Sequence, residues 1–488
     1  MVHEVATLKP EMLWRQFYAL TRIPRPSGHE ENVRAYVVSI GRRLGLETVL
    51  DDAGNVLVRK PATPGLELAP GVVLQAHLDM VPQCNSGVQH DFRHDPVDAF
   101  VDDGWVRARG TTLGADNGIG LAAGLAVLES TSLRHGPLEL LCTGNEEAGM
   151  TGARGLKPGV LHGQLLLNLD SEDEGVLFVG CAGGLEGTFC FEAIKRPFSG
   201  ECMAFSIMLS GLKGGHSGLD INRGRQNANR LMNRLLMEVH AAVPFRLCSI
   251  DGGGLRNAIP RESRVVLAVA ADHAGVALSL LQKHAAEMAG ELRETEPELR
   301  FSIEPVVLPS EALDVILTDH LLQTVADCPD GVTGMSQVMP GLVATSNNIA
   351  RVILEDDRLE IRTLLRSSVT SEMDALAAVM RGVAKKEGAS IRFDNGYPGW
   401  EPQSSSILVQ QMRRIYRDRF GREAKIEAVH AGLECGLFGA SYPKMEMLSF
   451  GPTIRFPHSP DECVDIVSVA RFWEFLVATL VGLGSVSG

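Results

Sequence analysis

Apolar positions near the start of the chain recur at the spacing of amphipathic helices. They stand three or four residues apart through 13–20 and again through 33–40, which predicts two helices. The runs Glu47–Leu50 and Val56–Arg59 then flank a short turn that contains Asp, Gly and Asn. Such a turn between two strand-like runs predicts a β-hairpin.

Three short apolar runs follow, and each is bounded by polar or glycine-rich residues. They are Val72–Ala76, Leu138–Cys142 and Leu165–Leu169. Runs of this kind are typical of central strands that are buried on both faces of a sheet. The segment Gly118–Leu128 is rich in Ala, Leu and Gly, which favours a helix packed on that sheet. The pattern predicts an α/β domain with covered faces.

The pattern changes near Gly183. From about 196 to 395, strand-like runs surround amphipathic helices, which suggests two strand–helix–strand units in a smaller α+β domain. After Tyr397 the first pattern returns, with a helix over Ser405–Phe420. We therefore expect residues 183–396 to form a domain inserted into another, which comprises 1–182 and 397–488. The expected strands are Ala204–Leu209, Arg264–Ala270, Arg300–Pro305 and Arg358–Leu365, and the expected helices are Arg225–Ala241, Val276–Glu296 and Ser371–Glu387.

Composition narrows the class of protein. Of the 488 residues 45% are hydrophobic and 22% are charged, as in a globular chain, and the formal net charge is -14. An acidic chain without a basic block argues against nucleic-acid binding. The negative charge indicates either ordinary solubility or acidic residues gathered around metal cations.

Cysteine usage and hydropathy suggest a location inside the cell. The nine cysteines are an odd number and include no Cys-x-x-Cys pair, which is typical of a reduced cytoplasmic protein. The first ten residues lack the apolar run of a signal peptide, and the run over 71–76 is too short to cross a bilayer. We expect a cytoplasmic protein that does not associate with the membrane.

Metal-capable side chains follow the predicted buried strands. His77 and Asp79 come directly after the first of these strands. Residues two apart in an extended segment point to the same side, so His77 could bind a metal while Asp79 accepts the proton of its other ring nitrogen. A plain surface pair is the alternative.

The other candidates each have a structural alternative as well. Asp116 precedes a predicted helix, where it could cap the helix or bridge two cations. Glu146 and Glu147 follow the second strand, where one could bind metal and the other could face the substrate, or both could form a solvated turn. Asp170 ends the third strand, and His458 lies in a loop near the C-terminus.

The combination is more specific than its parts. Ligands of open α/β sheets gather at the carboxyl ends of the strands, where these residues fall. Imidazole with carboxylate suits zinc, manganese or cobalt, and the lack of a cysteine ligand argues against a structural zinc site. Asp116, Glu147 and Asp170 together with a hydroxide would balance two divalent cations. Glu146 would then be free to move a proton.

The segments around these residues resemble the M20 metallopeptidases, and among them the aminoacyl-histidine dipeptidases, also called cytosol non-specific dipeptidases or peptidase D. The resemblance covers essentially the whole chain. It implies a catalytic domain of the zinc-exopeptidase type, with a mixed central sheet flanked by helices, and an inserted α+β lid and dimerisation domain. The segments that carry the resemblance are His77–Gln83, Gly110–Gly120, Asn145–Gly152, Asn168–Glu172, Gly211–Gly218, Arg256–Pro260, Gly432–Gly436 and His458–Pro460.

The resemblance implies hydrolysis of dipeptides, including those of the Xaa-His type, with two divalent ions per subunit. Zinc is the expected metal, with cobalt and manganese as alternatives. Another M20 reaction, such as deacylation of an N-acyl amino acid or removal of a C-terminal residue, is the rival activity. A non-catalytic small-molecule binder on the same fold is the rival of a different class.

Site residues follow from the matching motifs. The resemblance assigns one metal to His77 and Asp170, the other to Glu147 and His458, and a bridging role to Asp116. It makes Glu146 the general base and gives Asp79 a supporting role in catalysis. It also implies a cis peptide bond between Asp116 and Asn117.

The inserted domain should supply substrate contacts. By the same resemblance, His216 helps to polarise the scissile carbonyl, and Asn257 and Arg366 contact the substrate. Arg362 lies near Arg366 and is the alternative partner of the substrate carboxylate. Glu434 would touch the amino end of the substrate. The resemblance further implies a homodimer in which His216 reaches the active site of the partner subunit.

Overall fold

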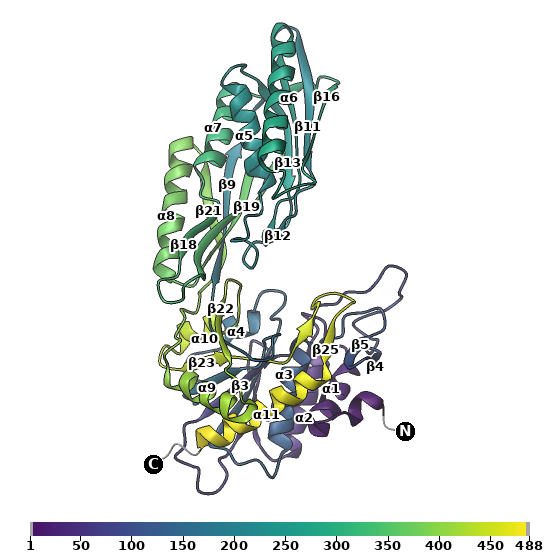
Figure 1. Cartoon of the computed structure of the whole chain (residues 1–488), viewed down its shortest axis with the longest axis vertical. Helices are drawn as coiled ribbons and strands as arrows, with labels where there is room; N and C mark the ends of the chain where they lie inside the picture. The colour runs from purple at the N-terminus through teal and green to yellow at the C-terminus, as the bar shows by residue number, and fades with distance from the viewer. Residues whose placement is uncertain (1–2, 485–488) are drawn as a thin grey trace. The chain divides into compact units, whose positions relative to one another are not determined.

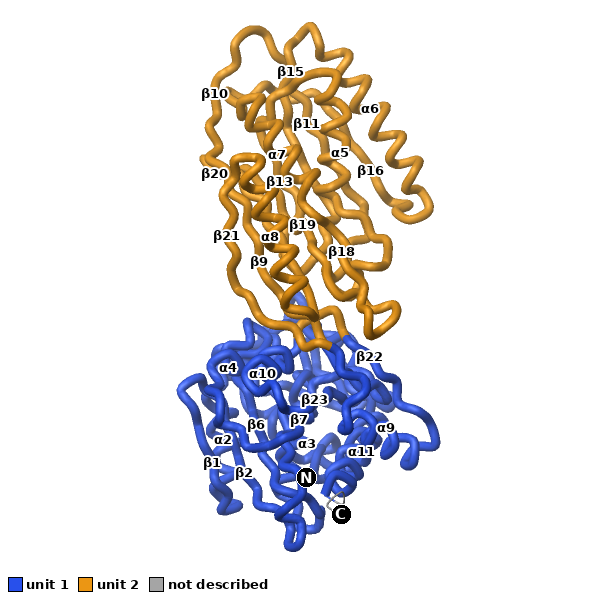
Figure 2. The backbone as a smooth tube through the Cα atoms, turned by 90° about the vertical axis from the view of Figure 1, so that its left-hand side faces the viewer, with its two compact units in different colours: residues 1–180, 402–428, 433–488 blue, residues 181–401, 429–432 orange. Residues whose placement is uncertain are grey.

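The structure, a computed structural model, describes residues 3–484 (Figure 1). Within this range the chain forms two compact units, which Figure 2 shows in different colours. Unit 1 comprises the residues up to Gly180, then Pro402–Ala428 and the residues from Leu433 onward. Unit 2 comprises Cys181–Glu401 and the short segment Val429–Gly432. That short segment has no counterpart in the expected boundaries, because four residues produce no change in composition.

Unit 1 is built on an eight-stranded mixed sheet in the order β1-β2-β6-β3-β7-β23-β8-β22. Strands β6, β3, β7 and β23 are consecutive in the sheet and run parallel to one another. Strands β1 and β2 form the expected antiparallel hairpin. The prediction of a mixed α/β sheet is therefore confirmed. The strands are β1 (Glu47–Leu50), β2 (Val56–Lys60), β3 (Val72–His77), β6 (Leu138–Thr143), β7 (Leu165–Asn168), β8 (Val176–Cys181), β22 (Lys425–Val429) and β23 (Glu446–Ser449).

Helix α3 (Ala115–Glu129) packs directly on the centre of this sheet. Its Ala- and Gly-rich sequence permits a close approach, since a Cβ at Gly124 would lie 2.4 Å from Cδ1 of Leu140. Every residue of β3 and β6 is buried, as the continuous apolar runs predicted. The other helices of unit 1 are α1 (Glu11–Thr21), α2 (Glu31–Arg43), α4 (Thr151–Gly155), α9 (Ile407–Phe420), α10 (Cys435–Ser441) and α11 (Ile466–Gly484), and a small second sheet holds β4 (Ala99–Asp102), β5 (Trp105–Ala108), β24 (Ile454–Arg455) and β25 (Cys463–Asp465).

Helix α11 was absent from the sequence prediction. Among the described residues it is the one helix long and apolar enough to cross a membrane by length and composition, a test that core helices also pass. It packs on α9, and its Phe472 and Phe475 rings lie 5.5 and 5.1 Å from the ring of Phe450. These contacts are those of a helix in the core of unit 1.

Unit 2 contains a nine-stranded sheet in the order β16-β11-β15-β13-β19-β20-β9-β21, with β18 paired to β19. Every pairing recorded in this sheet is antiparallel, so the two expected strand–helix–strand units merge into one continuous sheet. The sequence prediction missed the long strands that join them. The strands are β9 (Gly183–Glu192), β11 (Cys202–Ser210), β13 (Arg246–Gly253), β15 (Ser263–Ala270), β16 (Arg300–Val306), β18 (Gly331–Met335), β19 (Val343–Glu355), β20 (Arg358–Ser367) and β21 (Ser390–Tyr397).

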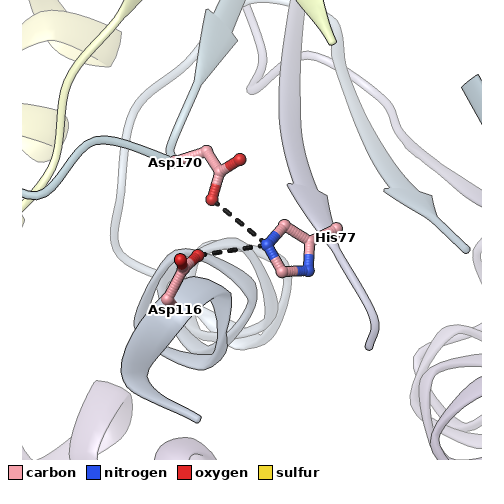
Figure 3. A group of neighbouring side chains, drawn as sticks. All are labelled: His77, Asp116 and Asp170. Atoms are coloured by element: carbon pink, nitrogen blue, oxygen red, sulfur yellow. Dashed lines mark hydrogen bonds and ion pairs between the residues drawn. The ribbon is translucent and has the colours of Figure 1, made fainter. Parts of the chain in front are cut away.

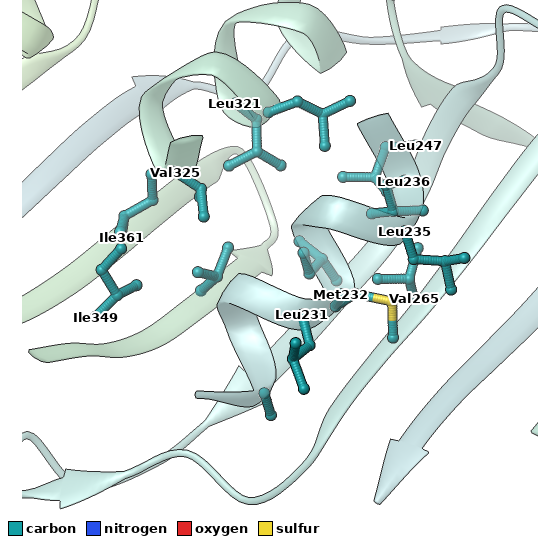
Figure 4. Packing of buried hydrophobic residues seen from close by; sticks show 14 of the residues in the cluster. Leu231, Met232, Leu235, Leu236, Leu247, Val265, Leu321, Val325, Ile349 and Ile361 are labelled. Carbon is teal, nitrogen blue, oxygen red and sulfur yellow. The ribbon is translucent and has the colours of Figure 1, made fainter. Parts of the chain in front are cut away.

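Four helices lie along this sheet and bury its apolar side chains. Figure 4 shows Leu231, Met232 and Leu235 of α5 packed among side chains of the strands and of α7, including Val265 and Leu321. Helix α7 was not predicted, because its apolar residues are interrupted by Thr, Asp and His. The helices are α5 (Ala228–His240), α6 (Ala274–Glu291), α7 (Val315–Asp327) and α8 (Thr370–Glu387), and the short strands β10 (Lys195–Pro197), β12 (Gly215–His216), β14 (Ala258–Ile259) and β17 (Glu311–Leu313) complete the unit.

Candidate metal centre

The metal-capable side chains of unit 1 meet at one edge of its sheet. Strands β3, β6 and β7 are parallel neighbours, so their carboxyl ends lie side by side. His77 is the last residue of β3, Glu146 and Glu147 lie in the turn after β6, and Asp170 follows β7. The ends of the apolar runs in the sequence mark the same positions, because each run forms a buried strand.

Asp116 stands in the first turn of α3 and faces two histidines with different oxygens. Its Oδ1 lies 3.1 Å from Nε2 of His77, and Oδ1 of Asp170 lies 3.4 Å from the same nitrogen (Figure 3). Its Oδ2 lies 3.2 Å from Nε2 of His458, and Oε1 of Glu147 lies 2.9 Å from that nitrogen. Each oxygen of Asp116 therefore belongs to a different histidine–carboxylate group.

Three overlapping groups of side chains could each hold an ion. In each, the candidate ligand atoms lie within 4.8 Å of one another. Glu146 falls in a group with His77 and Glu147, so it is close enough to act at the same centre. The groups are His77 with Asp116 and Asp170, His77 with Glu146 and Glu147, and Asp116 with Glu147 and His458.

Asp79 contacts His77 and also the acidic turn, which is the turn after β6 that carries Glu146 and Glu147. The backbone N–H groups of Glu146 and Glu147 donate to its two oxygens at 2.9 and 3.1 Å, and Oγ of Ser27 donates to Oδ2 at 2.7 Å. Nδ1 of His77 lies 3.4 Å from Oδ1 of Asp79 and 3.1 Å from its carbonyl oxygen. The carboxylate of Asp79 lies beside His77, as expected, but the nearer acceptor of Nδ1 is the backbone carbonyl of Asp79. No local pattern indicated that Asp79 also holds the turn.

The peptide bond between Asp116 and Asn117 is cis, as the resemblance implied. The amide of Asn117 donates to the carbonyl of Leu169 at 2.8 Å and also to Oδ1 of Asp170. Asn117 thereby fixes the backbone and the side chain at the end of β7. Its position inside the Gly-rich segment is the one sequence signal that could have identified it.

The carboxylates raise the pKa values of both histidines. Burial alone would lower the pKa of His77, but Asp170, Asp116 and Asp79 outweigh it and hold the pKa well above its usual range. The His458 ring donates hydrogen bonds to the carboxylates of Asp116 and Glu147, and these bonds raise its pKa to about 11. Both rings thus sit in a strongly negative environment.

The carboxylates crowd one another in turn. Burial, with the neighbouring carboxylates, raises the pKa of Asp170 to about 7 and that of Glu172 to about 8. Burial also raises the pKa of Glu146 well above its usual range. Without added cations, this centre therefore holds more buried acid than the chain's own positive groups neutralise.

The donor set fits two divalent ions. Two imidazoles and three carboxylates, one of which offers its two oxygens to opposite sides, are the ligands that zinc, cobalt and manganese accept in proteins. Two cations would also neutralise the excess of buried carboxylate. The side chain of His458 is 49% exposed, which leaves an approach for a substrate on that side.

Glu434 is bonded to strands β3 and β6, the strands that lead to His77 and to Glu146. Its carboxylate is fully buried and accepts hydrogen bonds from Nε2 of Gln75 at 2.6 Å and Oγ1 of Thr143 at 2.7 Å. Burial raises its pKa to about 8. Its other oxygen, Oε1, has no hydrogen-bond partner among the described residues.

The predicted substrate residues of unit 2 lie around one short strand pair. His216 in β12 pairs with Ala258 in β14, and the N–H of Ser217 donates to the carbonyl of Asn257 at 2.8 Å. The side chain of Asn257 is exposed. Burial, and then Arg366, lower the pKa of His216 to about 4, so its ring is neutral at neutral pH.

Arg366 and Arg362 occupy different surroundings. Arg366 is buried. Among residues 3–484 its guanidinium has only long contacts, with Oγ of Ser217 at 3.4 Å, the hydroxyl of Tyr397 at 3.3 Å and Nε2 of His216 at 3.5 Å. Arg362 is half-buried and donates to Glu360 at 2.8 Å. Arg366 is therefore the better placed of the two to receive an added carboxylate.

The chain matches peptidase family M20/M25/M40 over residues 73–481. It is 43% identical over 98% of both chains to the cytosol non-specific dipeptidase of Escherichia coli strain K12. It also resembles the crystal structure of aminoacylhistidine dipeptidase from Vibrio alginolyticus, with a TM-score of 0.90, 43% identity and 98% coverage of each chain. The structure of aminopeptidase PepT from Bacillus cereus shares the fold, with a TM-score of 0.56 and 16% identity over 98% of this chain and 99% of that one.

Proposed function

Because the chain belongs to peptidase family M20/M25/M40, we propose that it is a dipeptidase that cuts the amide bond of dipeptides, Xaa-His among them, with the help of two divalent ions. The relatives with 43% identity are a cytosol non-specific dipeptidase and an aminoacylhistidine dipeptidase, and both names support a dipeptide as the substrate. The chain spans 98% of each, so the resemblance covers the whole enzyme.

The observation that carries the proposal is the placement of Asp116 between two histidines. One oxygen faces His77 and the other faces His458, which supports a carboxylate shared by two ions. In this assignment His77 and Asp170 would hold one ion, Glu147 and His458 would hold the other, and Asp116 would be a ligand of both. Zinc suits these ligands best, and cobalt or manganese would fit as well.

Two ions bound here would supply a water of lowered pKa and polarise the scissile carbonyl. Glu146 then acts as the general base, takes a proton from the water and delivers it to the departing amine. Burial raises the pKa of Glu146 well above its usual range, as is common for carboxyl groups that transfer protons at active sites. Asp79 holds the backbone of Glu146 in place by accepting its N–H bond at 2.9 Å.

Unit 2 binds the other end of the substrate in this account. Arg366 pairs with the free carboxylate, since a guanidinium without an acidic partner matches a carboxylate in both charge and geometry. His216 stabilises the carbonyl oxygen as it gains charge, and Asn257 contacts the same end. Glu434 would contact the amino end, which requires a rearrangement that brings its buried carboxylate into reach.

The proposal includes a homodimer that forms through unit 2, in which His216 serves the active site of the partner subunit. It also includes a cytoplasmic location. None of the nine cysteines, which all lie within the described residues, forms a disulfide, and this fits a reducing compartment.

A substrate panel tests the proposal. Purified protein loaded with zinc, cobalt or manganese is assayed with dipeptides that include Xaa-His, with tripeptides, with N-acyl amino acids and with longer peptides. We expect the highest kcat/KM for dipeptides and poor turnover of longer peptides. Preference for N-acyl amino acids would instead indicate a deacylase, and release of C-terminal residues from longer peptides would indicate a carboxypeptidase.

A further inference from the structure

Four consecutive backbone N–H groups, two just before α3 and two in its first turn, converge on a single carboxylate, that of Glu462. Leu113 and Gly114 donate to its Oε2 at 2.8 and 2.9 Å. Ala115 and Asp116 donate to its Oε1 at 2.7 and 3.2 Å. A carboxylate has about four acceptor positions and no donor, so this set of donors satisfies it fully.

Arg25 donates hydrogen bonds to backbone carbonyl groups of the same segment and of the residues that follow β3. Its Nη2 donates to the carbonyl of Gly114 at 2.5 Å, and its Nη1 donates to the carbonyls of Leu78 and Asp79 at 3.0 and 2.7 Å. Gly114 has a φ of +70°, and a Cβ there would lie 2.7 Å from Nη2 of Arg25. This position therefore requires glycine for both its conformation and its contact with Arg25.

Both charged groups are buried. Arg25 is 1% exposed and Glu462 is 2% exposed. Buried charges are costly and are often replaceable by apolar residues without loss of stability. Both groups bond to the backbone around Asp116, so they have a role in placing this residue as well as in stability.

We propose that Glu462, assisted by Arg25, is a positioning residue that fixes the backbone of Asp116 so that its carboxylate meets both metal ions. The inference rests on the proposed two-metal function. Asp116 has to present its two oxygens in two directions, so a small shift of residues 113–116 would weaken both metal positions. Glu462 lies four residues after His458, so one C-terminal loop supplies a ligand and also holds the backbone of another ligand.

The variant Glu462→Gln tests this role. The amide keeps one acceptor oxygen, and its NH2 group turns hydrogen atoms toward two of the four N–H donors. Loss of a group that orients a ligand typically weakens metal affinity by about 10–100-fold, and here we expect both ions to be affected. The measurement is a cobalt(II) titration of the metal-free protein against a competing chelator, followed through the visible spectrum of the bound ion.

Glu139→Gln is the matched control. Glu139 is also a buried carboxylate of unit 1, and it accepts the N–H groups of His162 and Gly163 at 2.8 Å each and Nε of Arg59 at 2.9 Å. It lies near the start of β6, whereas the acidic turn follows the end of that strand. Its Gln variant should lower the melting temperature but leave cobalt affinity and spectrum as in the wild type.

The outcomes are distinguishable. If the wild type fails to bind two cobalt ions, the proposed function fails. If the wild type binds two ions and Glu462→Gln binds them as tightly and with the same spectrum, Glu462 has only a structural role and the inference is wrong. If Glu462→Gln does not fold, hydrogen exchange on the metal-free wild type decides, because residues 113–116 should already be protected. Free exchange there, with protection only after metal is added, would overturn the inference.

Discussion

Oδ2 of Asp116 lies 3.2 Å from Nε2 of His458, although 342 positions separate the two residues in the chain. The other oxygen of the same carboxylate lies 3.1 Å from His77. The fold thus brings the end of strand β3 and a loop near the C-terminus to the carboxylate of Asp116, which lies at the start of α3. In the proposed assignment this carboxylate serves two ions at once, which would explain why these segments meet.

Replacing Glu146 by Gln should remove most turnover while both ions stay bound. The amide cannot accept a proton from water, and general-base help contributes about 10²–10⁴-fold to the rate. Steady-state kinetics on a dipeptide give kcat, and metal analysis of the same sample gives the number of ions bound per chain. Glu147→Gln is the contrasting variant, since Glu147 is an assigned ligand and its loss should lower metal content. A Glu146→Gln enzyme with near wild-type kcat would rule out Glu146 as the base.

Replacing Arg366 by Met should lower kcat/KM for dipeptides by roughly 100-fold, mainly through KM. A bidentate bond between guanidinium and carboxylate is lost, and such charge-assisted contacts are worth a few kcal/mol. Arg362→Met is the control, because Arg362 already pairs with Glu360 and should matter little. Dipeptide amides, which lack the carboxylate, should be equally poor substrates for the wild type and Arg366→Met. If Arg362→Met is instead the defective variant, Arg362 and not Arg366 binds the free carboxylate of the substrate.

Much of the fold and of the metal centre could be predicted from the sequence. Buried strands such as β3 and β6 are continuous apolar runs, and their ends mark the positions of His77 and of the acidic turn. The long strands of the unit 2 sheet were harder to predict, because β19 mixes Asn, Ser and Thr with apolar residues and these polar side chains are all buried. Pattern alone does not distinguish such a strand from a loop.

The supporting residues could not be predicted for a different reason. Arg25 and Glu462 are charged, and an isolated charged residue in a sequence is usually exposed. Only the fold shows that both are buried and bonded to the backbone near Asp116. Glu434 was predicted as a substrate contact, but the structure reveals its hydrogen bonds to Gln75 and Thr143, which no local pattern encodes.

Mixing two inactive variants tests whether His216 acts across a dimer. Glu146→Gln and His216→Ala subunits, carrying different tags, are co-refolded or co-expressed and the heterodimer is isolated. If His216 serves the partner subunit, one active site carries both defects and the other carries neither, so about half of the wild-type activity per dimer should return. An authentic heterodimer without activity would show that His216 serves its own subunit.

His430 should remain neutral well into the acid range. Burial, and then Arg366 and His216, lower its pKa from the usual 6.5 to about 3. Because the unfolded chain binds this proton at a higher pH than the folded chain, the free energy of unfolding should fall as pH drops from about 6.5 toward 3. Imidazole chemical shifts of histidine-labelled protein report the ring's charge, and a His430→Gln variant should lose stability less steeply on acidification. A His430 ring that titrates at its usual pKa would contradict this account.

The central claim is that two divalent ions per chain are needed to hydrolyse a dipeptide. Metal-free protein is titrated with zinc or cobalt while the initial rate of dipeptide hydrolysis is recorded against the equivalents of ion bound per chain. The account predicts almost no rate without metal and a rate that reaches its maximum when two ions are bound. Full activity in the metal-free protein, or a maximum that is reached with a single ion bound, would contradict it.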